Sequence, residues 1–237
     1  MRKHEIIMDR KPYAIILAGG DGKRMGTKVA KQFLELDGKP ILRHTIEQFL
    51  SLPFEIEIIV VLPQELKKYW KDYCTQNDFL PKYFLPSGGI TRFHSVQNAL
   101  KFIPDGSLVA VHDGVRPFVS KQFLIDLFEQ AKSVPALIPA IKPVESIREI
   151  DKNGNSFSVD REKFLLVQTP QIFHSEVLVN AYKQAFSPKF TDDASVVEAS
   201  GCNIRICQGS RYNIKITTPE DLEVAKSFMF ILKDKTI

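Results

Sequence analysis

Glycines and basic residues follow a short apolar run near the start of the chain. The stretch AIILAGGDGKRMGTKVAKQF, residues 14–33, contains four glycines and four basic residues. Glycines let backbone N–H groups approach an anion closely, and such turns form anion-binding concavities. Arg24 and Lys31 lie beyond the loop, where two cations could neutralise a triphosphate and the charge that develops as it is cleaved. The pattern predicts a phosphate site, with a tight turn accompanied by solvated basic residues as the alternative.

Two common nucleotide-binding motifs do not fit this loop. The Walker loop requires Gly-x-x-x-x-Gly-Lys-Ser/Thr, which the sequence GGDGKRMG lacks. The Rossmann fingerprint requires Gly-x-Gly-x-x-Gly, and Met25 occupies the position of the third glycine after Gly20 and Gly22. The loop is therefore expected to bind phosphate without Walker or dinucleotide chemistry.

Two charged residues far along the chain could join the loop. Asp113 ends the apolar run LVAVHD, where a carboxylate suits a Mg²⁺ shell or a ribose or substrate hydroxyl, with a structural N-cap as the alternative. Lys215 lies in the strand-like run Ile-Lys-Ile, where burial of its charge is costly unless an anion meets it. An edge-strand lysine that faces water is the alternative. Arg116 is expected to anchor the DGVRPF turn, and His112 is interpreted as structural.

Alternating strands and helices are expected to position these residues. Continuous apolar runs predict strands buried on both faces at Tyr13–Ala18, Ile58–Leu62 and Leu108–His112. Helical spacing occurs at Ile41–Leu50, Gln64–Gln76, Ser95–Phe102 and Lys121–Ala131. This alternation predicts an α/β protein, with a Rossmann-like, mostly parallel sheet flanked by helices. Its ligand site is expected at the carboxyl ends of the strands.

The pattern changes after Ile138, where the chain is expected to leave the main sheet. The segment IKPVESIREIDKNGNSFSVDREKF carries a Lys-Asn-Gly-Asn turn, which predicts a projecting β-hairpin arm at about residues 141–163. The chain is expected to return through helices at Ser175–Phe186 and Asp192–Ser200 and a strand at Ile204–Cys207. A last helix is expected to open with Thr218 as N-cap, Pro219 in its first turn and Asp221 in a capping box. Without repeats or a linker, residues 1–237 are expected to form a single domain.

Composition narrows the class of protein. Hydrophobic residues make up 44% of the 237 residues and charged residues 25%, a balance typical of soluble globular proteins. The net charge of +4 is mild, and neither a nucleic-acid tail nor a signal peptide or membrane span is indicated. No nucleic acid or membrane is therefore expected as a partner. The three cysteines lack metal-ligand spacing and are expected to be reduced thiols in a cytoplasmic protein.

Several motifs in register resemble one enzyme family. The stretch LAGGDGKRMGTKVAKQFLELDGKPILRHTIEQF resembles the signature of nucleotidyltransferases that join a nucleoside triphosphate to a sugar or polyol phosphate. Five further motifs keep the order and spacing of the 2-C-methyl-D-erythritol 4-phosphate cytidylyltransferase family of the non-mevalonate isoprenoid pathway. They are GGITRFHSV (88–96), VHDGVRPFV (111–119), VDREKFLLVQTPQIF (159–173), TDDASVVEASG (191–201) and NIKITTPEDL (213–222). The resemblance covers nearly the whole chain.

The resemblance implies a nucleotidyltransferase-type fold and a reaction. CMP passes from CTP to 2-C-methyl-D-erythritol 4-phosphate, with formation of 4-diphosphocytidyl-2-C-methylerythritol and release of pyrophosphate. The acceptor phosphate is already ionised, so alignment and charge neutralisation carry the catalysis and no general base is required. The resemblance also implies Mg²⁺ held mainly by the CTP phosphates, with Asp113 as a candidate ligand, and a homodimer formed through the β-arm.

The resemblance further assigns roles to residues. The catalytic cations are Arg24, Lys31 and Lys215. The residues expected to contact the nucleotide are Ala18, Gly19, Gly20, Gly88, Gly89, Ser95, Asp113 and Gly114. Those expected to contact the acceptor are Asp113, Ser146, Arg161, Thr169 and Thr191. On the arm, Ser146 and Arg161 are expected to complete the site of the neighbouring subunit.

Some residues depart from the family pattern. Ala30 replaces the usual proline before Lys31, which changes the stiffness of the loop but retains the lysine. Ile90 stands where some members have an acidic residue, so a side-chain contact with the nucleotide is in doubt there. On the arm, Glu145 and Ser146 replace a common Asp-Thr pair and preserve its side-chain chemistry.

Three other functions are weighed against this one. A ribitol-5-phosphate cytidylyltransferase shares the glycine loop and the NIKITTP motif, but the stretch VDREKFLLVQTPQ favours the erythritol-phosphate enzyme. A nucleotide-sugar-dependent glycosyltransferase commonly carries an Asp-x-Asp metal motif, where this chain has His-Asp-Gly-Val at 112–115. A non-catalytic nucleotide-binding protein needs fewer charges than Arg24, Lys31 and Lys215 together provide.

Overall fold

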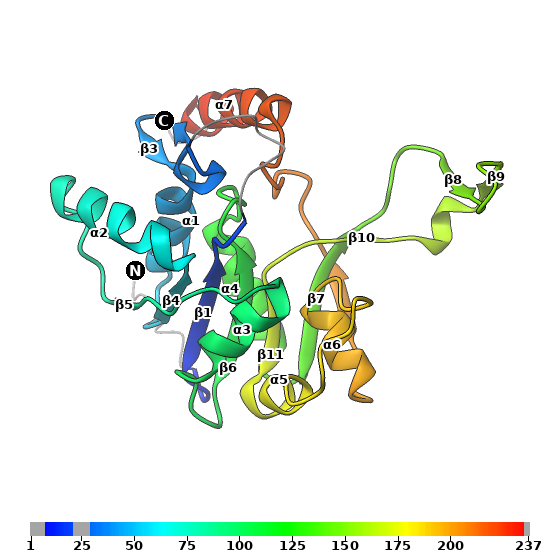
Figure 1. Cartoon of the computed structure of the whole chain (residues 1–237), viewed down its shortest axis with the longest axis horizontal. Helices are drawn as coiled ribbons and strands as arrows, with labels where there is room; N and C mark the ends of the chain where they lie inside the picture. The colour runs from blue at the N-terminus through cyan, green and yellow to red at the C-terminus, as the bar shows by residue number, and fades with distance from the viewer. Residues whose placement is uncertain (1–7, 21–28, 235–237) are drawn as a thin grey trace, which may run out of the picture.

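The computed structural model describes residues 8–20 and 29–234, which fold around one mixed β-sheet (Figure 1). Seven strands lie in the order β10 (Leu166–Val167), β7 (Ala136–Ile141), β11 (Gln171–His174), β6 (Leu108–Asp113), β1 (Pro12–Leu17), β4 (Glu57–Val61) and β5 (Tyr83–Phe84). A further strand, β12 (Arg205–Gln208), pairs with β7. The expected α/β architecture is confirmed.

The centre of the sheet is parallel. β1 pairs in parallel with β4 and β6, and β4 pairs in parallel with β5. In register, Ile15 lies between Ile59 of β4 and Val111 of β6, and all three side chains are fully buried. Because helices cover both faces of this part, its strands are continuous apolar runs. The three strands predicted here are confirmed to within one residue at each end.

Antiparallel strands occur in the half of the sheet beyond β6. β11 runs antiparallel between β6 and β7, and β10 pairs antiparallel with the end of β7. The sequence pattern does not predict β5, β7, β10 or β11. Pro139 interrupts the apolar run of β7, and β11 has only four residues, too few to show a clear periodicity. The sheet is therefore mixed but mostly parallel.

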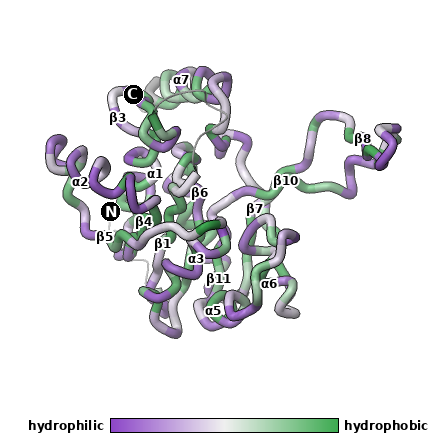
Figure 2. Tube along the Cα trace, viewed as in Figure 1, coloured by the Kyte–Doolittle hydropathy of each residue, from purple (hydrophilic) through white to green (hydrophobic). Residues whose placement is uncertain are grey.

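Helices cover both faces of the sheet. On one face lie α1 (Ile41–Leu50), α2 (Lys67–Gln76) and α4 (Lys121–Ala131), and on the other α3 (Arg92–Leu100), α5 (Ser175–Ala181) and α6 (Asp193–Ala199). Alternate residues of β1 divide between the two cores. Ala14 and Ile16 pack with the first set of helices, and Tyr13 and Ile15 pack with the second. The hydrophobic segments in Figure 2 accordingly follow the central strands.

The helix boundaries agree with the prediction in most places. α1 and α4 have the predicted bounds, and the short helix η3 (Gln64–Leu66) with α2 spans the predicted 64–76. α3 begins at Arg92, three residues before the predicted start, because the Thr91 side chain caps it by accepting the N–H of His94. α5 ends at Ala181, before the predicted end at residue 186.

The predicted arm projects from the edge of the sheet as a β-hairpin (Figure 1). β8 (Ile147–Ile150) and β9 (Ser156–Val159) pair antiparallel, and the short helix η4 (Arg161–Lys163) follows. At the tip, the Asp151 carboxylate accepts the N–H groups of Asn153 and Asn155, and Gly154 has a φ of 84°. This local bonding accounts for the Lys-Asn-Gly-Asn turn that the sequence predicts.

A third, smaller core lies beside the main sheet. It joins the hairpin of β2 (Glu35–Leu36) and β3 (Lys39–Pro40), the segment after β6 and the last helix, α7 (Pro219–Asp234). The predicted capping box of α7 is confirmed, since Asp221 N–H donates to Thr218 Oγ1 and Thr218 N–H donates to Asp221 Oδ2. In the part of the chain that is described, none of the helices has the length and apolar character needed to cross a bilayer.

Candidate functional site

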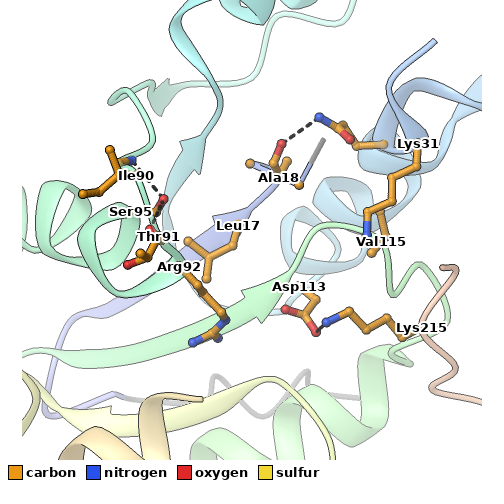
Figure 3. A pocket seen from close by; sticks show the side chains of 14 residues that line it. Leu17, Ala18, Lys31, Ile90, Thr91, Arg92, Ser95, Asp113, Val115 and Lys215 are labelled. Atoms are coloured by element: carbon orange, nitrogen blue, oxygen red, sulfur yellow. Dashed lines mark hydrogen bonds and ion pairs between the residues drawn. The ribbon is translucent and has the colours of Figure 1, made fainter. Parts of the chain in front are cut away.

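A cavity of about 370 Å³ opens at the carboxyl ends of β1 and β6 (Figure 3). It is formed by the loop after β1, the short helix η2 (Lys31–Phe33), the start of α3, the end of β6 and the segment before α7. Of the predicted site residues, those lining it are Ala18, Gly19, Gly20, Lys31, Gly89, Ser95, Asp113 and Lys215. The structure thus brings together residues more than 100 positions apart in the sequence.

A second, adjoining cavity of about 290 Å³ shares Arg92, Asp113 and Lys215 with the first. It is also lined by Thr169 and Thr191, the two threonines predicted to contact the acceptor. The three shared residues therefore lie where the two cavities adjoin.

Other predicted site residues lie elsewhere. Gly88 and Gly114 are next to lining residues in the sequence but do not themselves line either cavity. Ser146 and Arg161 are on the arm, and the Arg161 guanidinium donates to the Val144 carbonyl. Arg24 lies outside the described residues.

Asp113 is the negative centre of the site. Its Oδ2 is 2.9 Å from Lys215 Nζ and 3.3 Å from Arg116 Nε. Burial by itself would raise the pKa of Asp113, but the charges of Lys215, Arg92 and Arg116 hold it well below its ordinary value. The carboxylate is therefore ionised at neutral pH. The expected anchoring role of Arg116 is confirmed, since it binds both Asp113 and the Asn213 carbonyl, the latter at 2.7 Å.

The buried His112 is linked to Asp113 through the hydroxyl of Thr169. His112 is fully buried, and burial lowers its pKa to about 4, so the ring is neutral at neutral pH. Its Nε2 is 3.2 Å from the Arg116 carbonyl, which only accepts, so the proton is on Nε2 and Nδ1 accepts from Thr169 Oγ1 at 3.1 Å. The same threonine oxygen accepts the Asp113 N–H at 3.1 Å. Thr169 thus links His112 to Asp113, in addition to its predicted contact with the acceptor.

The turn before α3 is held by Ser95. Its hydroxyl accepts the Gly89 N–H at 3.0 Å and donates to the Thr91 carbonyl at 3.0 Å. A Cβ on Gly89 would lie 2.4 Å from the Cβ of His94, so only glycine fits this close approach without rearrangement. Ile90, between them, is almost fully exposed at the cavity wall.

The loop after β1 is held by internal hydrogen bonds. Ala18 N–H donates to the Val61 carbonyl at 2.9 Å, and Gln32 Nε2 donates to the Ala18 carbonyl at 2.8 Å. Lys31 lies against the same loop, because a Cβ on Gly20 would be 3.4 Å from Lys31 Nζ. Gly20 therefore leaves the room that the lysine occupies. Figure 3 shows Lys31 descending toward the cavity and Lys215 reaching across to Asp113.

The surroundings of Lys215 differ from the expectation. Residues 213–217 belong to no strand, and the Lys215 side chain is 40% exposed, not buried in an apolar strand. The neighbouring Ile216 is fully buried in the third core. The alternation of apolar and charged residues in Ile-Lys-Ile thus reflects a coil segment with one side against a core.

Arg92 and its partners are not predicted from the sequence. The Arg92 guanidinium is 2.5 Å from Asp193 Oδ2, and Tyr182 Oη donates to Asp193 Oδ1 at 2.6 Å. Asp193 is fully buried, so its charge depends on Arg92 for compensation. Arg92 lines both cavities, yet much of its charge is balanced within the protein. Its place directly after the N-cap Thr91 could have indicated that it begins α3. Its partner Asp193 lies 101 residues away, so the ion pair leaves no local pattern in the sequence.

The described residues offer one carboxylate to a metal ion here. Asp113 is the carboxylate among the described residues that line the first cavity, and the described chain holds no group of three or more His, Cys, Asp or Glu side chains placed for a metal. Mg²⁺ is commonly bound by one or two carboxylates together with substrate phosphates. The residues present therefore fit an ion that a nucleotide's phosphates hold in the main.

The fold and its site define an α/β protein of the nucleotidyltransferase type, with its ligand cavity at the carboxyl ends of parallel strands. The family model described as 2-C-methyl-D-erythritol 4-phosphate cytidylyltransferase matches residues 13–232. The chain belongs to this family of enzymes.

Individual relatives agree with this assignment. The protein of that name from Phocaeicola vulgatus is 47% identical over 90% of this chain and 97% of its own length. The one from Clostridium beijerinckii is 41% identical over 91% and 97%. Among solved structures, the Francisella tularensis enzyme of that name has a TM-score of 0.77 at 35% identity, covering 92% of this chain and 99% of its own. The Anaerococcus prevotii 4-diphosphocytidyl-2C-methyl-D-erythritol synthase has a TM-score of 0.79 at 28% identity, covering 93% and 96%.

Proposed function

We propose that this protein transfers CMP from CTP to 2-C-methyl-D-erythritol 4-phosphate in the synthesis of isoprenoid precursors. The names of its relatives, matched over nearly the whole of both chains, support this activity. The observation that carries the proposal is the meeting of Lys31, Asp113 and Lys215, from three distant segments, at one cavity beside the glycine turns. We also propose that residues 1–237 act as a single domain.

In this reaction an oxygen of the acceptor phosphate attacks the α-phosphorus of CTP. A new P–O bond forms, the bond from the α-phosphorus to the bridging oxygen breaks, and pyrophosphate leaves with the electron pair. Lys31 and Lys215 carry the positive charge that the pentacoordinate transition state requires, together with Arg24 of the glycine loop. Asp113 orients Lys215 through the 2.9 Å ion pair. Its carboxylate can also accept a hydrogen bond from a hydroxyl of the ribose or the acceptor. Backbone groups of residues 18–20 and 88–89 bind the base and ribose.

A divalent cation completes the charge balance. We propose that the CTP phosphates would hold most of the coordination of Mg²⁺ and that Asp113 would be its candidate protein ligand. The ion supplies Lewis-acid stabilisation of the phosphate oxygens. Asp113 is ionised at neutral pH, as such a ligand must be.

The acceptor occupies the second cavity, and the arm of a neighbouring subunit closes it. Thr169 and Thr191 line that cavity, whereas Ser146 and Arg161 lie on the arm, outside both cavities of their own chain. The arm exposes apolar side chains that water solvates poorly, among them Val144, Ile150 and Phe157, which are 54%, 71% and 57% exposed. We therefore propose a homodimer through the arm. The free thiols of all three cysteines support a cytoplasmic location.

Pyrophosphate release tests the proposal directly. Purified protein with CTP and Mg²⁺ is expected to release pyrophosphate with 2-C-methyl-D-erythritol 4-phosphate and to be much slower with ribitol 5-phosphate. Excess chelator is expected to abolish turnover. Faster reaction with ribitol 5-phosphate would assign the alternative cytidylyltransferase activity. Binding of CTP without pyrophosphate release from either acceptor would indicate a non-catalytic nucleotide-binding protein.

A further inference from the structure

The segment that carries Lys215 lacks the support of regular structure. Residues 213–217 belong to no helix or strand, so no hydrogen-bonded ladder fixes the backbone on either side of the lysine. After Lys215, the N–H of Ile216 donates to the Val115 carbonyl at 2.9 Å, and Ile216 is buried. Before it, the backbone is held by the Ile214 N–H, which donates to the Tyr212 carbonyl at 2.7 Å, and by the contacts of Asn213.

Asn213 joins this segment to the two residues that hold Asp113, which are Thr169 and Arg116. Its Nδ2 donates to the Thr169 carbonyl at 2.7 Å, and its own carbonyl accepts from Arg116 Nη1 at 2.7 Å. Thr169 in turn holds the Asp113 N–H, and Arg116 holds the Asp113 carboxylate. Asn213 is therefore two residues from the lysine of the Asp113–Lys215 ion pair and bonded to both supports of its aspartate.

The side chain is poorly matched to a purely stabilising role. Asn213 is fully buried, and among the described residues its Oδ1 has no hydrogen-bond partner. A buried acceptor without a partner destabilises a folded chain, because it loses its hydrogen bonds to water. The hydrogen bond that this side chain does make, from Nδ2 to the Thr169 carbonyl, ties the Lys215 segment to the residue that holds the Asp113 N–H.

We propose that Asn213 is a positioning residue that holds Lys215 in register with Asp113 for the reaction. The inference rests on the proposed function, because it takes Lys215 as a catalytic cation. With Asn213 in place, the segment is fixed at residues 213 and 216, and the lysine leaves it between two anchored points. Without the carboxamide, the backbone before Lys215 loses its bond to Thr169, and the amine no longer lies where charge develops.

A double-mutant cycle tests this role. Asn213→Ala is expected to lower kcat for CTP and 2-C-methyl-D-erythritol 4-phosphate about 10- to 100-fold, with smaller changes in both KM values, because misplacing a catalytic group by about 1 Å has effects of this size. Lys215→Met is expected to lower kcat further. In the Lys215→Met background, Asn213→Ala should then have no additional effect, because its effect acts through the lysine. Asn213→Leu, which fills a similar volume without a donor, serves as the second variant if the alanine variant does not fold.

The control is Gln184→Ala. Gln184 also donates through a carboxamide to backbone carbonyls, those of Ala181 and Val196, but it lines neither cavity. Its kcat should match the wild type. The positioning role is overturned if the Asn213 variants keep kcat near wild type, or if their effect is the same with and without Lys215. A Lys215→Met variant with wild-type kcat would instead remove Lys215 from the proposed mechanism.

Discussion

The cavity at the carboxyl ends of β1 and β6 and the projecting arm hold their predicted site residues in opposite ways. In the cavity, Asp113 is 8% exposed and is held by side chains from three separate segments of the chain. On the arm, Ser146 and Arg161 are exposed, and the contacts of Arg161 are to its own neighbourhood, Val144 and Glu162. The cavity is thus organised within one chain, whereas the arm is organised only as a hairpin.

This difference indicates where each half of the site obtains its rigidity. The cavity residues follow strands of the main sheet or contact them, so folding of the chain fixes them before any ligand binds. A two-stranded hairpin is at best marginally stable in water, and the arm has no core of its own among the three described. Under the proposed function, binding of the nucleotide in the cavity should therefore survive changes to the arm, and binding of the acceptor should depend on what the arm contacts.

The largest effect is expected from a change in the cavity. Lys31→Ala should lower kcat by roughly 10²- to 10³-fold, because it removes positive charge from the transition state in a preorganised site. The fold should persist, since Lys31 is only partly buried in a short helix outside the main sheet. Pyrophosphate release and the melting temperature measure the two effects.

Lys68→Ala provides a matched control, because Lys68 is an exposed lysine of α2 that, within the described part of the chain, pairs with Asp72 on its own helix. Its kcat should be that of the wild type. A Lys31→Ala variant with near wild-type kcat would show that the cavity does not use this lysine in catalysis.

Lowering the pH below 6.5 should reduce the free energy of unfolding through His112 in the sheet, at pH values where the charge of the arm hardly changes. Burial lowers the pKa of His112 to about 4 in the folded protein, whereas the unfolded chain has an ordinary value near 6.5. Between these values the unfolded chain binds a proton that the folded chain does not, so the free energy of unfolding should fall by roughly 3 kcal/mol as the pH drops from 6.5 to 4. Above pH 6.5 the histidine has no such effect, and the lowered pKa of Asp113 matters only below its ordinary value of 3.8.

Urea unfolding at a series of pH values measures this slope. His112→Gln should flatten it over that range, since glutamine can still donate and accept but does not titrate. The arm, residues 141–163, contains no histidine, so its charge should change little above pH 5. An equally steep slope in the variant would assign the acid sensitivity to other groups.

The comparison also shows what sequence alone could reveal. Apolar runs and helical spacing predicted the three central parallel strands and the bounds of α1 and α4, because these elements follow from local periodicity. β11 was not predicted, because a four-residue strand acquires its character from the strands on either side. Its insertion between β6 and β7 brings Thr169 up to Asp113, a contact that depends on the order of strands in the sheet.

In the site, the residues expected to do chemistry were easier to predict than the contacts that hold them in place. The resemblance placed Lys31, Asp113 and Lys215 together, and they line one cavity. It did not indicate that Arg92 pairs with Asp193 or that Asn213 bonds to Thr169, because both contacts join residues more than 40 positions apart. Such pairs leave no periodic signal, so the supports of a site are harder to predict than the residues that do chemistry.

A change on the arm should alter affinity for the acceptor and leave the cavity intact. Arg161→Ala should raise KM for 2-C-methyl-D-erythritol 4-phosphate about 10- to 100-fold, the value of a charged hydrogen bond to phosphate. KM for CTP should change little, because the described residues that line the proposed nucleotide cavity all lie outside the arm. Steady-state kinetics with each substrate varied in turn separate the two values. Equal losses for both substrates would contradict an acceptor-side role.

Mixing two defective variants shows whose site the arm completes. If Arg161 serves the neighbouring subunit, a heterodimer of Lys31→Ala and Arg161→Ala chains has one site with both residues intact. Random reassociation should then restore about a quarter of the wild-type rate at low acceptor concentration, because about half of the dimers are mixed and each has one good site. Mixing Lys31→Ala with a Lys31→Ala/Arg161→Ala double variant should restore nothing. If Arg161 acted within its own chain, neither mixture would recover, because every Arg161 would then share its site with a missing lysine. Recovery therefore requires the proposed dimer, in which the arm of one chain reaches the cavity of the other, and the described residues that line that cavity come from one chain.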